Sequence, residues 1–199
     1  GPLLTAFSNF FESEPNYQPG LLHAVNDQYF KRVAAIEFTL NHDDGRNLSS
    51  LEEADVILVG ISRTSKTPLS MYLSLEGVKV VNVPIVMGTI LPEKLFQVDQ
   101  RKIFGLTIDP DALFQIRKNR LSRLGLSKDE GDYADISKVV EEIEWANRLF
   151  SENKRWPVFN VTGKALEETA AEIMKLLNMR KVNRFKQSKR FDSTDENKE

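Results

Sequence analysis

Apolar residues recur along this chain with two different periods, and these periods separate predicted helices from predicted strands. The first eleven residues carry apolar side chains at i, i+1, i+4, i+7 and i+8, which predicts an amphipathic helix marked by Leu3, Leu4, Phe7, Phe10 and Phe11. A second helical stripe follows a Pro- and Gly-containing stretch and consists of Val25, Tyr29, Val33, Ile36 and Leu40. It leads into a polar loop at residues 41–45 that concentrates titratable groups.

From residue 54 onward, short apolar runs alternate with helical patterns. Four runs predict strands, at residues 56–59, 78–86, 103–108 and 158–161. They are apolar almost throughout, which is typical of parallel strands that are buried on both faces. Predicted helices connect them or follow them: from Asp109-Pro110 to Gly125, from Ile136 to Phe150, and from Thr162 to Arg180 and Lys181. The predicted fold class is therefore α/β, a P-loop-type parallel sheet flanked by helices.

The same patterns divide the chain into three parts. We expect residues 1–50 to be the C-terminal part of an N-terminal helical region, because the first helical stripe begins abruptly. Residues 51–182 are predicted to form a P-loop-like α/β nucleotide-binding domain. Residues 183–199 lose their apolar periodicity and become charged, so we expect them to form a disordered tail.

Composition narrows the class of protein. The chain has 199 residues, of which 41% are hydrophobic, and its formal charge of −2 gives no global reason to expect a nucleic-acid partner. It contains no cysteine, which excludes a thiolate-bound zinc and a cysteine nucleophile. No run approaches the roughly 18 to 20 apolar residues that a membrane span needs. We therefore expect a soluble protein without membrane contacts, in the cytoplasm, with the plastid stroma as the other compartment consistent with the sequence.

The strand predicted at 56–59 runs directly into a loop that is typical of phosphate binding. The loop and the start of the following helix read Gly60-Ile61-Ser62-Arg63-Thr64-Ser65-Lys66-Thr67. A phosphate there would meet backbone N–H groups at a helix N-terminus together with the ammonium group of Lys66. Thr67 is placed to bind a phosphate oxygen or a magnesium ion. Ser65 stands where the P-loop pattern has its second glycine, so spacing alone leaves open a Ser/Thr-rich turn that only caps a helix.

Other candidate residues each have an ordinary explanation beside the functional one. Arg63 could contact a phosphate as a bidentate donor, or it could be a solvated loop residue. Arg117 and Arg120 lie one helical turn apart and could close over a nucleotide, although surface arginines on helices are common. Asp43 and Asp44 could supply a general base or hold magnesium, or they could simply belong to a turn before Gly45.

The segment at 60–73, Gly-Ile-Ser-Arg-Thr-Ser-Lys-Thr-Pro-Leu-Ser-Met-Tyr-Leu, closely resembles the pyruvate, phosphate dikinase regulatory protein family, the bifunctional kinase/pyrophosphorylases. The resemblance covers roughly residues 19 to 171. It includes the blocks His42-Asp43-Asp44-Gly45, Lys79-Val80-Val81-Asn82-Val83-Pro84, Phe104-Gly105-Leu106-Thr107-Ile108-Asp109-Pro110 and Ile116-Arg117 with Arg120. Family members usually carry a further N-terminal region, so the resemblance implies a truncated chain.

The resemblance implies an unusual enzyme. It would use ADP to phosphorylate a threonine of pyruvate, phosphate dikinase, and it would remove that phosphate with inorganic phosphate, releasing pyrophosphate. Lys66, Arg63, Asp43 and Asp44 would be catalytic, residues 60–67 together with Arg117 and Arg120 would bind the nucleotide, and Thr67 would bind Mg²⁺. The resemblance further implies a homodimer. ADP specificity does not follow from the spacing of the loop.

Two details of the sequence refine this expectation. A related branch of the family acts on phosphoenolpyruvate synthase and reads Cys-Gly where this chain reads Thr64-Ser65, which favours the dikinase as the partner. Asn160 stands where relatives often have Asp or Glu. Two other functions stay open: an ATP-dependent small-molecule P-loop kinase, which would normally keep glycine before the lysine and add an Arg-rich lid, and a non-catalytic nucleotide-sensing protein that binds the dikinase.

Overall fold

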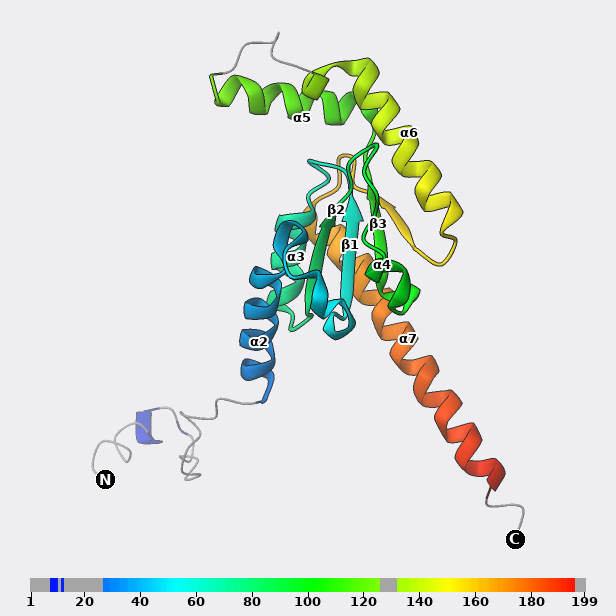
Figure 1. Cartoon of the computed structure of the whole chain (residues 1–199). Coiled ribbons are helices and arrows are strands. Elements are labelled where there is room, and N and C mark those ends of the chain that lie inside the picture. Colours follow the sequence, from blue (N-terminus) through cyan, green and yellow to red (C-terminus); the bar gives the residue numbers. More distant parts are fainter. Residues whose placement is uncertain (1–7, 11, 13–26, 126–131, 196–199) are drawn as a thin grey trace.

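A computed structural model describes residues 8–10, 12, 27–125 and 132–195 of the chain (Figure 1). Most of the helix predicted at residues 3–11 lies outside these residues, and so does Val25. The other predicted strands and helices all fall within the described part of the chain.

A four-stranded parallel sheet forms the centre of the molecule, as predicted. Its strands have the order β2-β1-β3-β4. Each strand is shorter than the apolar run that predicted it, except β1, which includes one residue more; the bounds are β1 Val56–Gly60, β2 Val80–Pro84, β3 Ile103–Thr107 and β4 Val158–Asn160. In the register of the sheet, Gly60 lies opposite Pro84 on one side and Leu106 on the other. The carboxyl ends of the three strands therefore meet at one edge.

Helices precede, connect and follow the strands. The α-helices are α2 Asp27–Asn41, α3 Lys66–Leu75, α4 Lys94–Gln97, α5 Pro110–Arg123, α6 Ile136–Glu152 and α7 Leu166–Asp195. Short 3-10 helices are η2 Asp43–Gly45, η3 Leu48–Glu53, η4 Gln100–Lys102 and η5 Asp132–Ala134. Helix α6 begins where the Asp135 carboxylate accepts hydrogen bonds from the backbone N–H groups of Ser137 and Lys138. Local sequence signals thus fix several helix ends.

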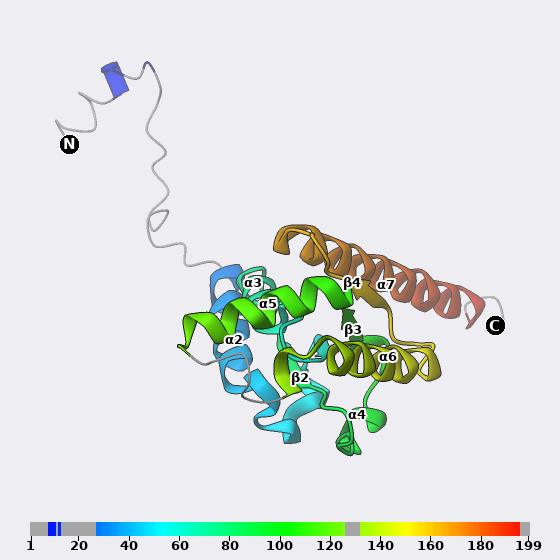
Figure 2. The same ribbon diagram turned by 90° about the horizontal axis from the view of Figure 1, so that it is seen from above.

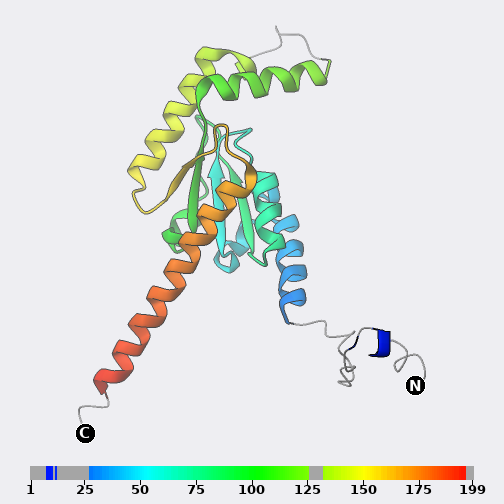
Figure 3. The ribbon, with the colours of Figure 1, turned by 180° about the vertical axis from the view of Figure 1, so that it is seen from behind.

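The two faces of the sheet are covered by different helices (Figures 1 and 3). On one face, Val56, Leu58, Phe104 and Leu106 pack with apolar side chains of α3 and α7. On the other face, a larger cluster joins the alternate strand residues to η3, α4, α5 and α6. All five residues of β1 are buried, which is why its sequence is apolar without alternation.

Helix α7 differs from the prediction. The sequence predicts its end at Arg180 and Lys181, but the helix continues to Asp195 and extends beyond the sheet (Figure 3). The sequence after Gly163 contains neither glycine nor proline, so no residue type that breaks a helix interrupts it. The loss of the apolar stripe in the sequence therefore does not mark the end of the helix.

Candidate functional site: a loop at the carboxyl edge of the sheet

The candidate phosphate-binding loop connects β1 to α3 and lies at the carboxyl edge of the sheet. Gly60 closes the strand in a position where no side chain fits. A Cβ atom at this residue would lie 2.8 Å from the Leu106 carbonyl oxygen and 2.8 Å from Thr64 Oγ1. The glycine therefore lets the loop pass directly over the neighbouring strand β3.

Two residues of the loop have left-handed backbone conformations. Arg63 has φ of 71°, and Ser65 has φ of 59° and ψ of 22°. Ser65 thus adopts the conformation that glycine reaches most easily, at the position where the P-loop pattern has glycine. The substitution changes the residue but keeps a loop geometry compatible with a P-loop.

Lys66 begins helix α3 and is almost completely buried, with 6% of its surface exposed. Its Nζ atom donates a hydrogen bond of 2.8 Å to the Ile61 carbonyl oxygen, which also accepts from Thr64 Oγ1 at 2.9 Å. Burial lowers the pKa of Lys66 from 10.5 to about 8, although the charges of Asp44 and Asp43 oppose this shift. Within the described part of the chain, no carboxylate forms an ion pair with Lys66. The ammonium group is therefore held beneath the loop without a fixed counter-charge.

A polar cluster that includes Thr67, the residue after Lys66, joins three segments that are far apart in the sequence. Asp43, which follows α2, accepts hydrogen bonds at its Oδ1 atom from Asn82 Nδ2 at 2.7 Å and from Thr67 Oγ1 at 3.2 Å. Asn82 Nδ2 also donates to Thr67 Oγ1 at 3.1 Å. Asn82 is 1% exposed, and its Oδ1 atom is without a hydrogen-bond partner in the described structure. Sequence analysis did not assign a role to Asn82, although it is a polar residue within an otherwise apolar strand.

Thr67 and Asp43 provide oxygen atoms of the kind that Mg²⁺ prefers. Among the described residues there is no group of three or more His, Cys, Asp or Glu side chains that could hold a metal ion by itself. The cluster therefore fits a magnesium ion that takes most of its ligands from water and phosphate oxygens. Asp44 lies beside it on the surface, with φ of 56°.

A second cation near the loop, Arg117, comes from α5, which crosses the carboxyl edge of the sheet (Figure 2). Arg117 is 3% exposed and forms an ion pair of 2.7 Å with Glu142 on α6. Its guanidinium also donates to the backbone carbonyl oxygens of Ser62, at 3.5 Å, and Tyr133, at 3.3 Å. Arg117 therefore connects α5 to the loop through the Ser62 carbonyl oxygen. Its contact with a nucleotide stays a prediction.

The remaining predicted arginines are exposed. Arg63 donates from Nε to the Tyr133 hydroxyl at 3.1 Å, which links the loop to η5. Arg120 lies one turn after Arg117 but on the exposed surface of α5. Glu142 and Tyr133 were missed by sequence analysis because nothing in their own segments indicates a contact with the loop.

Asn160 at the end of β4 has structural partners. Its Nδ2 atom donates to Asp109 Oδ1 at 2.8 Å, and its Oδ1 atom accepts from the backbone N–H of Thr162 at 2.9 Å. Thr162 Oγ1 accepts in turn from the backbone N–H of Asp109 at 2.7 Å. These bonds join the start of α5 to the loop before α7.

The protein is of the α/β class, with a parallel sheet flanked by helices. Its candidate anion-binding site is the lysine-bearing loop between β1 and α3, at the carboxyl edge of the sheet. In the described part of the chain, no helix has the length and apolar character needed to cross a membrane. The sequence pattern of the kinase/pyrophosphorylase family matches residues 1–174. The chain belongs to this family.

Individual relatives support the assignment. A Bdellovibrio bacteriovorus protein with the provisional name pyruvate, phosphate dikinase regulatory protein is 53% identical over 180 residues, 90% of this chain and 64% of the relative. A Geobacter sulfurreducens protein with the same provisional name is 51% identical over 176 residues, 88% of this chain and 65% of the relative. Pyruvate, phosphate dikinase regulatory protein 1, chloroplastic, of Arabidopsis thaliana is 48% identical over 187 residues, 92% of this chain and 46% of the relative. The chain thus spans less than two thirds of the length of these relatives.

Proposed function

We propose that this protein is a bifunctional regulator of pyruvate, phosphate dikinase. In one direction it transfers the β-phosphoryl group of ADP to a threonine hydroxyl of the dikinase, forming phosphothreonine and AMP. In the other direction inorganic phosphate attacks the phosphothreonine, and threonine and pyrophosphate are the products. The observation that carries the proposal is the buried ammonium group of Lys66 beneath the loop, held by a hydrogen bond to the Ile61 carbonyl oxygen rather than by a carboxylate.

Lys66 suits both directions of this reaction. The charge that develops on a transferred phosphoryl group is stabilised chiefly by fixed donors and cations. A cation buried without an ion-paired carboxylate gains more from an arriving phosphate than one that already has a partner. The two phosphates of ADP or of the pyrophosphate product would be held by Lys66, by Arg63 and by the backbone of residues 60–67. Arg117 and Arg120 would complete the nucleotide site.

The cluster of Asp43, Thr67 and Asn82 would hold Mg²⁺ against the same phosphates through the Thr67 hydroxyl and the Asp43 carboxylate. The ion would neutralise part of their charge. Because Asp43 already accepts two hydrogen bonds at one oxygen, we assign the general base that receives the threonine proton to the exposed Asp44. Asp43 would then position Thr67 in addition to holding Mg²⁺.

The decisive experiment incubates the protein with the dikinase and either ADP or ATP and analyses the target by mass spectrometry. We expect phosphothreonine together with AMP when ADP is supplied, and pyrophosphate when the phosphorylated dikinase receives inorganic phosphate. Lys66→Ala should lose both reactions, whereas Lys154→Ala, on an exposed turn away from the loop, should keep them. Absence of phosphothreonine and AMP with the unchanged protein would contradict the enzyme, and reaction with ATP alone would indicate an ATP-dependent kinase.

We further propose that the protein forms a homodimer and works in the cytoplasm or, in a plant, the plastid stroma. Helix α2 supports a protein partner, because Tyr29, Phe30, Val33 and Leu40 are between 43% and 61% exposed there. Light scattering combined with size-exclusion chromatography would measure the mass in solution. A monomeric mass at micromolar concentration would contradict the dimer.

A further inference from the structure

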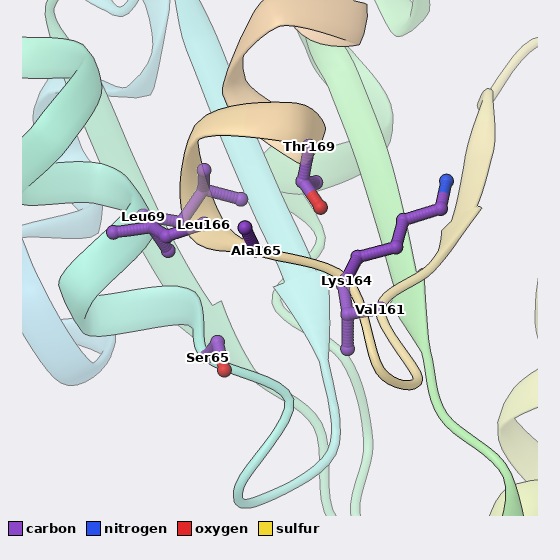
Figure 4. Close-up of a pocket in the computed structure, with 7 residues that line it drawn as sticks. All are labelled: Ser65, Leu69, Val161, Lys164, Ala165, Leu166 and Thr169. Carbon is purple, nitrogen blue, oxygen red and sulfur yellow. The ribbon is translucent and has the colours of Figure 1, made fainter.

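A small cavity lies beside the candidate phosphate loop, between the start of α3 and the first turn of α7 (Figure 4). Its volume is about 60 Å³. Ser65 belongs both to the loop and to the wall of this cavity, and Ser65 directly precedes Lys66. A ligand with its phosphates over Lys66 therefore has the cavity within reach of its remaining part.

The walls of the cavity are mainly aliphatic. Leu69 lines it from α3, Val161 and Ala165 line it from the segment that joins β4 to α7, and Leu166 lines it from the start of α7. Leu69 is fully buried, so the packing around it holds this side of the cavity in place. Apolar walls from two separate elements are typical of small-molecule sites and favour a flat, weakly polar group between them.

Polar groups mark the edges of the same cavity. The hydroxyl groups of Ser65 and Thr169 belong to different elements and lie toward opposite ends of the lining (Figure 4). Lys164, which also lines the cavity, is held by an ion pair of 2.8 Å with Glu172, and this contact directs its charge away from the apolar walls. A ligand with apolar faces and hydrogen-bonding edges matches this distribution.

We propose that this cavity receives the base of the nucleoside diphosphate, with Leu69 on one face of the ring and Val161, Ala165 and Leu166 on the other. The inference rests on the proposed function, because it requires that the phosphates lie in the loop at residues 60–67. The cavity is smaller than a purine, so the ring enters by one edge and leaves the other edge in solvent. The hydroxyl groups of Ser65 and Thr169 are positioned to bond with ring or ribose atoms.

The first test compares ligands on the unchanged protein by calorimetry. ADP and ribose 5-diphosphate carry the same phosphates and sugar, but only ADP has a base. Burial of the ring faces should make ADP bind at least about tenfold more tightly. Equal affinities would overturn the inference, while failure of both ligands and of pyrophosphate to bind would instead contradict the proposed function.

The second test closes the cavity. Ala165→Trp places a large side chain at a lining position, whereas Ala171→Trp makes the same change on an exposed position of α7 that does not line the cavity. Ala165→Trp should remove most of the advantage of ADP over ribose 5-diphosphate and leave pyrophosphate binding within about twofold, and Ala171→Trp should change neither. Unchanged ADP affinity in Ala165→Trp would overturn the inference. An equal loss of affinity for ADP and pyrophosphate would also overturn it, because the cavity would then be part of the phosphate-binding site.

Discussion

Two buried cations bond to neighbouring carbonyl oxygens of one loop, and they are held in different ways. Arg117 has Glu142 as an ion-pair partner at 2.7 Å and donates to backbone carbonyl groups as well. Lys66 has only the Ile61 carbonyl oxygen as its hydrogen-bond partner among the described residues, and burial lowers its pKa to about 8. The charges of Asp44, Asp43 and Glu142 raise the pKa of Lys66 and that of Arg117 lowers it, but burial is the largest cause.

The difference distinguishes a cation with an ion-pair partner from a cation with none among the described residues. A buried ion pair leaves little unmet demand for a counter-charge, so removing one partner is costly to the fold. A buried lysine without an ion pair is itself a cost to the fold, which an anion can offset on binding. We therefore expect the loss of the Arg117 ion pair and the loss of the Lys66 charge to change stability in opposite directions.

The largest effect should follow removal of the partner of Arg117. Glu142→Ala leaves the guanidinium buried without its carboxylate and should lower the free energy of unfolding by about 3 kcal/mol. Urea denaturation followed by circular dichroism measures this. Glu141→Ala is the matched control, because Glu141 is exposed on the same helix and pairs with Lys138 at the surface, where its loss should cost less than about 1 kcal/mol. Similar losses in the two variants would remove the distinction between the cations.

Replacing the other cation should have the opposite sign. Lys66→Met removes a buried charge and should raise the free energy of unfolding by roughly 2 kcal/mol at pH 7, since one pKa unit corresponds to about 1.4 kcal/mol and one hydrogen bond is lost. The same variant should bind pyrophosphate at least about tenfold more weakly, because a charged hydrogen bond to the ligand disappears. Denaturation and calorimetry on one preparation test both. A variant that is less stable than the unchanged protein would contradict the assignment of Lys66 as a ligand group.

The stability gap between the unchanged protein and Lys66→Met should depend on pH. Below pH 8 Lys66 is protonated in both the folded and the unfolded chain, so its burial cost is fully present. Between pH 8 and 10.5 the unfolded chain binds more protons at this residue, and the unchanged protein gains stability relative to the variant. Denaturation at pH 7 and pH 9.5 should show the gap shrinking to roughly half or less. A constant gap would mean that the pKa is not lowered.

The smallest expected effect concerns the two serines of the loop. Ser65, beside Lys66, has φ of 59°, whereas Ser62, whose carbonyl oxygen bonds to Arg117, is not among the residues with positive φ. Ser65→Gly should raise the free energy of unfolding by about 0.5 kcal/mol, because relief of the left-handed strain exceeds the extra entropy of the unfolded chain. Ser62→Gly should lower it by about 0.5 to 1 kcal/mol. Thermal denaturation of both variants resolves the signs, and stabilisation by Ser62→Gly would contradict the explanation.

Local signals in the sequence were sufficient for most of the fold. The unbroken apolar character of β1 indicated a strand buried on both faces, and the Asp-Pro pair at residues 109–110 placed the start of α5. The candidate phosphate-binding loop was also recognisable as a pattern, because its spacing and its position after a strand are local properties. The end of α7 was wrong for a local reason as well: charged helix-forming residues continue a helix after its apolar face has ended.

The candidate site beyond the loop depended on packing. Asp43 meets Asn82 across 39 residues, Arg63 meets Tyr133 across 70, and Arg117 reaches the Ser62 carbonyl oxygen across 55. Whether such residues meet depends on how α2, α5 and α6 lie against the sheet, and periodicity does not encode that arrangement.

The sequence by itself determined the order of strands and helices, the loop with its lysine, and through its resemblance the family. Only the tertiary structure decided that Lys66 is buried with no ion pair to the described residues, that Arg117 pairs with Glu142, and that a cavity opens beside Ser65. The physical reason is that backbone conformation follows mainly from neighbouring residues, whereas burial, pairing and pKa depend on which distant side chains share the same space.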